Sequence, residues 1–399
     1  MPAYNLKRFS NPNSLKAVSI DCLIQFLSPY SDFLAERGLS LDEHQHVQDD
    51  FDYVTLVDIL MSPDNNTPRQ LVDALYYINE LSTTQGMDLL LTEAESRQVE
   101  IELKNPTPID VAMRMWIREK EIVEYAHARE SMARSRTFVY FRTDMKQSMA
   151  REELKMDAVQ SLQGDLDDWF VRRQRGRGSR VFVFDKESEV WFLVRHGEAF
   201  KREGVLDDGR SSSVFYRPEQ YDVLVYNPRL GDLRIHATSK NEVEMYRELF
   251  GRHIFGDDRY FPSTAKYTLE PVRKNGDASL VCADIPGIES ITLVELEFGS
   301  IGFHENTVQW RAADIFDWMR STGQTIPPRA RLFKAVFNVM FSGAKRPRKV
   351  CIQLPNIAQF QRDGDGRLVE QWLELRGFII GFEQETNRYE EHSQLLVAV

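Results

Sequence analysis

Apolar residues in the first part of the chain have the spacing that is typical of α-helices. After Pro68, the residues Leu71, Val72, Leu75 and Tyr76 recur three and four positions apart, which places them on one helical face. Serine or threonine followed by proline marks three predicted helix starts: Ser28-Pro29, Thr67-Pro68 and Thr107-Pro108. The hydroxyl can cap the helix, and proline in the first turn loses no hydrogen bond. We therefore predict a helical domain over residues 1–165, including one long helix from Thr107 to about Glu130.

The pattern changes after a further helix near 156–170. Short segments rich in β-branched and aromatic residues then alternate with turns, which predicts strands joined as hairpins. One short strand, 137–141, is predicted before that helix. The predicted strand regions after it are 181–194, 221–237, 279–283, 291–297 and 332–354, and the predicted helices are 241–250, 312–321 and 366–376. The fold class is therefore α+β: a helical N-terminal domain followed by a mixed, largely antiparallel β-sheet domain with packed helices. The second domain spans 166–399 and could divide again near 262–275.

Composition narrows the classes of protein that the chain can represent. The 399 residues are 42% hydrophobic, which is ample for real cores, and the formal net charge is -11. An acidic chain is not expected to bind nucleic acid over its whole surface, so any such contact must come from local basic patches. The three cysteines are far apart and form no CxxC pair, which indicates a reducing, cytoplasmic setting. We expect no membrane-spanning segment, no metal and no cofactor, because the phosphate-loop, esterase and zinc motifs do not occur.

Two basic clusters are the most concrete binding features of the sequence. The first contains Arg172, Arg173, Arg175, Arg177 and Arg180, and the second contains Lys345, Arg346, Arg348 and Lys349. Guanidinium groups on flexible turns suit phosphate backbones, and Trp169 and Phe170 stand beside the first cluster, where they could stack on bases. The same residues could instead dock an acidic protein partner or form salt bridges within the chain.

The stretch WFLVRHGEAF, residues 191–200, places Arg195, His196 and Gly197 after an apolar run. It resembles the start of the histidine phosphatases and phosphoglycerate mutases. The resemblance covers fewer than a dozen residues and implies that His196 attacks phosphorus while Arg195 holds the phosphate oxygens. The alternative is one long strand from Glu189 to Phe200 with a bulge at Gly197. The residues that follow, KREGVLDDGRSSS, predict a charged loop.

A second resemblance concerns residues 221–250, where strand, turn, strand and helix follow one another. This order is similar to the core of the PD-(D/E)xK nucleases, which bind a divalent metal through two carboxylates next to a lysine. Asp222 and Lys240 match the outer members of that motif, but Thr238 stands where the second acid is needed. The resemblance therefore implies a nuclease with a degenerate site. The alternative is a hairpin followed by a surface helix.

These observations lead to one leading hypothesis and one rival. The leading hypothesis is a non-catalytic binding component, an accessory subunit of a larger microbial assembly, that docks nucleic acid or a protein partner through its Arg-rich loops. The rival is a phosphate-ester hydrolase acting either at Arg195 and His196 or at Asp222 and Lys240, so the sequence leaves open whether the protein is an enzyme. We also expect Trp169 and Trp191 to be buried, because both lie on apolar faces.

Overall fold

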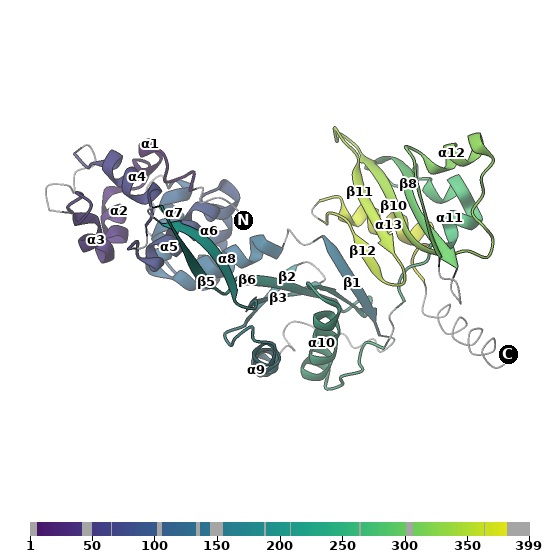
Figure 1. Cartoon of the computed structure of the whole chain (residues 1–399), viewed down its shortest axis with the longest axis horizontal. Coiled ribbons are helices and arrows are strands. Elements are labelled where there is room, and N and C mark those ends of the chain that lie inside the picture. Colours follow the sequence, from purple (N-terminus) through teal and green to yellow (C-terminus); the bar gives the residue numbers. More distant parts are fainter. Residues whose placement is uncertain are drawn as a thin grey trace. The chain divides into compact units, whose positions relative to one another are not determined.

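A computed structural model shows how the chain folds. It describes residues 6–41, 50–64, 66–101, 106–132, 136–143, 155–186, 189–207, 209–262, 265–300, 306–362 and 364–380. By the density of contacts the chain divides into two compact units, Met1–Ser131 and Met132–Val399 (Figure 1). Each unit is described separately below.

The first unit consists of helices. Their bounds are α1 Pro12–Leu15, α2 Ile20–Leu27, η1 Ser28–Tyr30, α3 Ser31–Ala35, α4 Tyr53–Met61, α5 Arg69–Leu81, α6 Thr84–Ser96, α7 Pro108–Arg118 and α8 Lys120–Met132, the last of which crosses the boundary. The stripe predicted after Pro68 is confirmed, because Leu71 and Leu75 of α5 are fully buried in the core of this unit. The long helix predicted from Thr107 is broken at Glu119, whose extended backbone separates α7 from α8.

Only one of the three predicted caps is formed as expected. The Thr107 side chain accepts a hydrogen bond from the Asp110 N–H at the start of α7. Ser28 is the first residue of the 3-10 helix η1 but does not cap it, since its hydroxyl donates back to the Ile24 carbonyl at the end of α2. Thr67 accepts from the Asp64 N–H in the preceding turn, and α5 begins without a side-chain cap. A hydroxyl before proline can therefore close the preceding turn as readily as it opens the next helix.

The second unit is built on a sheet of ten strands in the order β2-β3-β6-β7-β1-β12-β11-β10-β8-β9. The strands are β1 Thr137–Arg142, β2 Arg180–Lys186, β3 Glu189–Gly197, β6 Glu219–Asn227, β7 Asp232–His236, β8 Ile288–Ser300, β9 Asn306–Arg311, β10 Arg331–Phe341, β11 Arg348–Gln353 and β12 Ile357–Gln359. All neighbouring strands pair antiparallel. The α+β class, with N-terminal helices followed by an antiparallel sheet and packed helices, is confirmed.

Two helices cover one end of this sheet. α9 Met156–Arg172 and α10 Lys240–Phe250 lie on the same face of β3 and β6 (Figure 1). Every second residue of β3, namely Val190, Phe192 and Val194, points into the core between sheet and helices. This alternation continues to His196, and it decides the environment of the site described below.

The predicted end of α10 at Gly251 is confirmed, because the α-helix runs from Lys240 to Phe250 and Gly251 is its C-cap. A π-helical turn, Gly251–Phe255, follows directly. The helical conformation ends at Gly256, whose φ of 78° is the left-handed conformation that commonly closes a helix. Gly251 has ordinary helical angles. Its missing side chain instead makes room for the Asp257 carbonyl, which would lie 2.5 Å from an added Cβ.

The other end of the sheet carries α11 Glu270–Asn275, α12 Ile315–Thr322 and α13 Gly366–Leu375. Trp372 of α13 is fully buried, with its ring centroid 5.0 Å from that of Phe337 on β10. The strand predicted at 279–283 is wrong, because Gly276–Leu280 forms a 3-10 helix. There the Ser279 hydroxyl donates to the Gly276 carbonyl, a local bond that competes with strand pairing.

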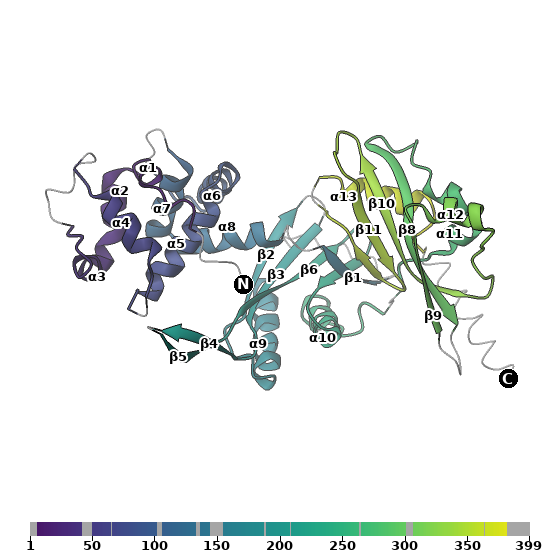
Figure 2. The ribbon, with the colours of Figure 1, turned by 45° about the horizontal axis from the view of Figure 1, so that its top comes forward.

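The charged loop predicted after the RHG stretch is also wrong. Residues Lys201–Asp207 and Arg210–Tyr216 form the strands β4 and β5 of a separate two-stranded hairpin. Figure 2 shows this hairpin extending away from the strands β3 and β6 that it connects. An Asp-Gly pair at 208–209 is the usual sequence signal for such a turn.

Candidate functional site

The first basic cluster lies in the segment that follows α9. Arg172 and Arg173 are exposed, and the Arg173 guanidinium lies 3.6 Å from the centroid of the Trp169 ring. Arg177 is exposed as well but forms an ion pair with Asp168 at 2.6 Å. Arg180 is half-buried, with its guanidinium 4.9 Å from the centroid of Phe182. The cluster therefore presents its cations mainly at the end of α9.

Arg175 behaves differently, because its side chain turns into the protein. Its guanidinium forms an ion pair with Glu242 of α10 and lies 3.6 Å from a carboxylate oxygen of Glu198. Glu242 is fully buried and also accepts the Ser239 N–H at 2.6 Å, which completes the capping box at the start of α10. These hydrogen bonds lower the pKa of Glu242 although burial opposes ionisation. Arg175 is thus an internal counter-ion, one of the alternatives that the sequence left open.

His196 and Asp222 meet beside this ion pair. The His196 Nε2 atom lies 2.9 Å from Asp222 Oδ2, and the Tyr246 hydroxyl donates to the same oxygen at 2.8 Å. His196 Nδ1 lies 3.1 Å from the Gly197 carbonyl, and the imidazole stacks on Phe170 with centroids 4.2 Å apart. Both ring nitrogens face acceptors, an arrangement that favours the doubly protonated imidazole. Burial lowers the pKa of His196, but the hydrogen bond and the charge of Asp222 outweigh it and raise the pKa overall.

The cluster has the donor types of a metal site. Ligand atoms of His196, Asp222 and Glu242 all lie within 4.8 Å of one another. The cationic partners of these carboxylates, however, are the Arg175 guanidinium and the protonated imidazole. A divalent ion would have to displace both cations from a site that is closed to solvent. The arrangement is that of a neutralised buried charge network that joins α9, β3, β6 and α10.

The candidate catalytic residues are distributed differently from either resemblance. His196 is grouped with Asp222, whereas Arg195, on the opposite face of β3, lies 3.8 Å from Glu219. Lys240 is exposed in the first turn of α10. The sequence treated His196 and Asp222 as members of two separate sites. Each lies an even number of positions from the core residues of its strand, His196 in β3 and Asp222 in β6. This alternation was the sequence signal that could have placed both residues on the same face of the sheet.

The second basic cluster spans the turn between β10 and β11 and the first two residues of β11. Lys345, Arg346 and Lys349 are exposed there. Arg348 is half-buried and forms an ion pair with Asp365 at 2.8 Å. Three of its four cations therefore face solvent.

The β4–β5 hairpin adjoins the first basic cluster, a connection that the sequence did not reveal. An added Cβ on Gly176 would lie 1.7 Å from the Arg217 guanidinium, so this side chain from the base of the hairpin rests directly on the loop. An added Cβ on Gly197 would lie 2.5 Å from Arg217 Cδ and 2.7 Å from the Arg175 carbonyl. Two glycines thus let the hairpin base and the loop pack together.

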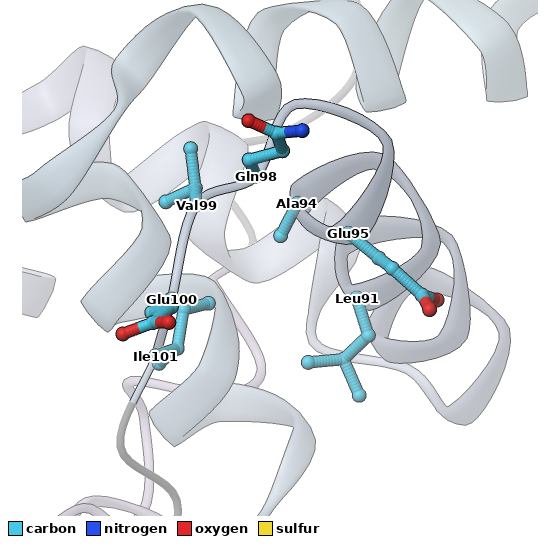
Figure 3. Close-up of a pocket in the computed structure, with 7 residues that line it drawn as sticks. All are labelled: Leu91, Ala94, Glu95, Gln98, Val99, Glu100 and Ile101. Atoms are coloured by element: carbon cyan, nitrogen blue, oxygen red, sulfur yellow. The ribbon is translucent and has the colours of Figure 1, made fainter.

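A hollow of about 350 Å³ in the first unit lies between the end of α6 and residues 98–101 (Figure 3). Its floor is aliphatic, formed by Leu91, Ala94, Val99 and Ile101. The other lining residues are Glu95, Gln98 and Glu100. These side chains include no nucleophile, histidine or cation, so the hollow carries no catalytic constellation.

In comparison with known proteins, no family model matches this chain and no curated protein is similar to it in sequence. None of the helices in the described segments is both long and apolar enough to span a membrane.

Proposed function

We propose that this protein is a non-catalytic binding component that docks an anionic partner, nucleic acid or an acidic protein surface, through its Arg-rich loops. In the cell it would serve as an accessory subunit of a larger microbial assembly in the cytoplasm. The observation that carries the proposal is the exposure of Arg172 and Arg173. Neither has a carboxylate within ion-pairing distance among the described residues, although the chain has a net charge of -11.

Uncompensated cations on an acidic chain keep a local positive potential, which attracts anions. Arg173 adds a guanidinium that lies over the Trp169 ring, and a guanidinium in this position keeps N–H groups that can bind phosphate or carboxylate oxygens. The exposed Lys345, Arg346 and Lys349 offer a second contact of the same sign. Arg175 is not part of this surface, because Glu242 already binds it.

The proposal is tested with the double variant R172S/R173S. Binding of heparin and of short DNA and RNA is followed by fluorescence anisotropy across a salt series. Each lost phosphate contact should reduce the slope of log affinity against log salt by about 0.7 to 0.9. The matched control is R259S/K274S, which removes the same charge from two other exposed sites in the second unit. A variant that binds every anion like the wild type, with an unchanged salt slope, would overturn the proposal.

The same samples test the hydrolase alternatives. Cleavage of the nucleic acid that requires magnesium and is lost in D222N or K240A would support the nuclease. Hydrolysis of a generic phosphoester without metal, lost in H196A, would support the phosphatase. Intact nucleic acid and phosphoester in all samples are expected if the protein only binds.

A further inference from the structure

The β4–β5 hairpin exposes an unusual amount of apolar surface. Phe200, Leu206 and Phe215 are 65%, 78% and 66% exposed. In the described part of the chain β4 and β5 pair only with each other. An isolated two-stranded hairpin is marginally stable in water, and exposed aromatic patches of this kind usually mark binding sites.

The pairing register sorts the hairpin side chains onto two faces. Arg202 pairs with Phe215, Gly204 with Ser213, and Leu206 with Ser211. These residues share one face, and the alternation extends it to Phe200 and Arg217 at the base. We call this set the aromatic–arginine face: it holds two phenylalanines, two arginines, one leucine and small residues, and no carboxylate. The opposite face includes Glu203, which accepts the Tyr216 hydroxyl at 2.8 Å.

This face is continuous with the first basic cluster. The Arg217 guanidinium lies 4.4 Å from the centroid of the Phe200 ring. The same guanidinium rests on Gly176, in the loop that carries Arg175 and Arg177. The hairpin face and the loop of the first basic cluster therefore meet at Arg217.

The combination of groups favours one class of ligand over an apolar protein surface, a base-free polyanion and a double helix. An apolar protein surface would bury the rings but leave two guanidinium groups without partners, which is unfavourable. A base-free polyanion would bind the arginines but leave the rings in water. A double helix binds through its phosphates, because its base faces are already stacked. A single strand offers phosphates and free base faces together, and each stacked base on an aromatic ring contributes substantially to affinity.

We propose that the aromatic–arginine face binds single-stranded nucleic acid, with bases stacked on Phe200 and Phe215 and phosphates held by Arg202 and Arg217. This inference rests on the proposed function in so far as the ligand is an anion, and it adds the ligand class and a site outside the Arg-rich loops. Because stacking is independent of base identity, binding should be tolerant of sequence.

The test compares the full-length wild type with F200S/F215S, using a fluorescein-labelled single-stranded oligonucleotide and labelled heparin as a base-free polyanion. The double variant should lose at least about tenfold in oligonucleotide affinity. Its heparin affinity should stay within about twofold. V214A, on the opposite face of the same strand, is the matched control and should bind both probes normally. R202S/R217S should weaken binding of both probes.

F200W/F215W distinguishes the loss of the aromatic rings from misfolding, since it keeps an aromatic ring at both positions. This variant should retain oligonucleotide binding, and its tryptophan fluorescence should be quenched when bases stack on it. Equal affinity of F200S/F215S and wild type for the oligonucleotide would overturn the inference, as would equal affinity of the wild type for duplex and single strand. A wild-type dimer that F200S/F215S dissociates, seen by light scattering, would identify a self-association surface and overturn it too.

These results also separate the inference from the function on which it rests. If heparin binding depends on Arg172 and Arg173 while the oligonucleotide does not bind or ignores the hairpin variants, the inference fails and the proposed function stands. If neither probe binds and no acidic protein partner depends on Arg172 and Arg173, both fail.

Discussion

Replacing Asp222 by asparagine should show how much the buried charge network contributes to stability. Asp222 is 2% exposed, and its Oδ2 atom accepts hydrogen bonds from both His196 and Tyr246. Burial raises the pKa of Tyr246 far above neutrality, so this hydroxyl remains a donor. An asparagine can place either oxygen or nitrogen at the Oδ2 position, and neither choice preserves both hydrogen bonds together with the balancing negative charge.

The expected loss of stability follows from these two orientations of the asparagine amide. With oxygen at that position, both donors keep an acceptor, but the imidazolium loses the charge that balances it. With nitrogen there, the imidazole must become neutral and the Tyr246 hydroxyl loses its acceptor. Removing one partner from a buried pair costs about 3–5 kcal/mol, and leaving one buried group unsatisfied costs about 1–3 kcal/mol. We expect D222N to reduce the free energy of unfolding by about 3 kcal/mol.

The pH dependence gives a second, independent signature. The folded-state pKa of His196 is raised above the value in the unfolded chain, about 6.5. Stability from its protonation is therefore complete below pH 6.5 and is lost as the pH rises through the folded-state pKa, at about 1.4 kcal/mol for each unit of difference. D222N should flatten this alkaline decline. Glu242, whose pKa is lowered, should act on the acid side, where stability falls as it becomes protonated.

Urea unfolding followed by tryptophan fluorescence is a suitable assay, because every tryptophan except Trp116 lies in the second unit. The matched control is H253N. His253 lies 2.8 Å from Asp165, but the Asp165 side chain is 44% exposed, so this pair should contribute about 1 kcal/mol or less. A loss below about 1 kcal/mol in D222N, with the pH profile of the wild type, would refute the argument that the network is a buried, charged one.

Two further predictions test the packing around the site. Gly176→Ala should destabilise the protein by about 1–2 kcal/mol, because its φ is +81° and the new Cβ would collide with Arg217. Gly178 also has a positive φ, but nothing lies within 4 Å of an added Cβ. Gly178→Ala should therefore lose less stability in urea unfolding. Equal losses for the two variants would mean that the contact with Arg217 is unimportant. Trp191→Ala should cost about 3–5 kcal/mol since Trp191 is only 6% exposed, whereas Trp169→Ala should cost clearly less because its ring is half-buried under Arg173. Equal thermal shifts for the two tryptophan variants would contradict this assignment of the core.

The comparison of Trp169 with Trp191 shows what an apolar pattern can predict. Both residues were expected to be buried, and Trp191 is. Trp169 lies at the edge of the apolar stripe of α9, between the helix surface that packs against the sheet and the surface that faces solvent. The Arg173 guanidinium covers the exposed face of the Trp169 ring. A helical pattern gives the direction of a side chain but not the extent of the surface that it packs against.

The candidate site shows the same limit. The sequence identified His196, Asp222 and the arginine clusters by residue type, but it assigned His196 and Asp222 to rival sites and left open whether Arg175 binds a partner or forms a salt bridge within the chain. Those assignments depend on the antiparallel register of β3 with β6 and on the packing of α10 across them. The register pairs Val194 with Asp222, and it becomes visible only when two distant segments are aligned.

The sequence by itself determined the elements whose signals are local: the helical character of the first unit and the strand pairs at 181–194, 221–237 and 332–354. It determined the α+β class for the same reason, since periodicity and turn residues act within a few positions. The tertiary structure alone decided that Arg175 is internal, that His196 and Asp222 share one buried network, and that a hairpin carries the aromatic–arginine face. Each of these depends on contacts between residues far apart in the chain, and no local propensity encodes which of them will meet.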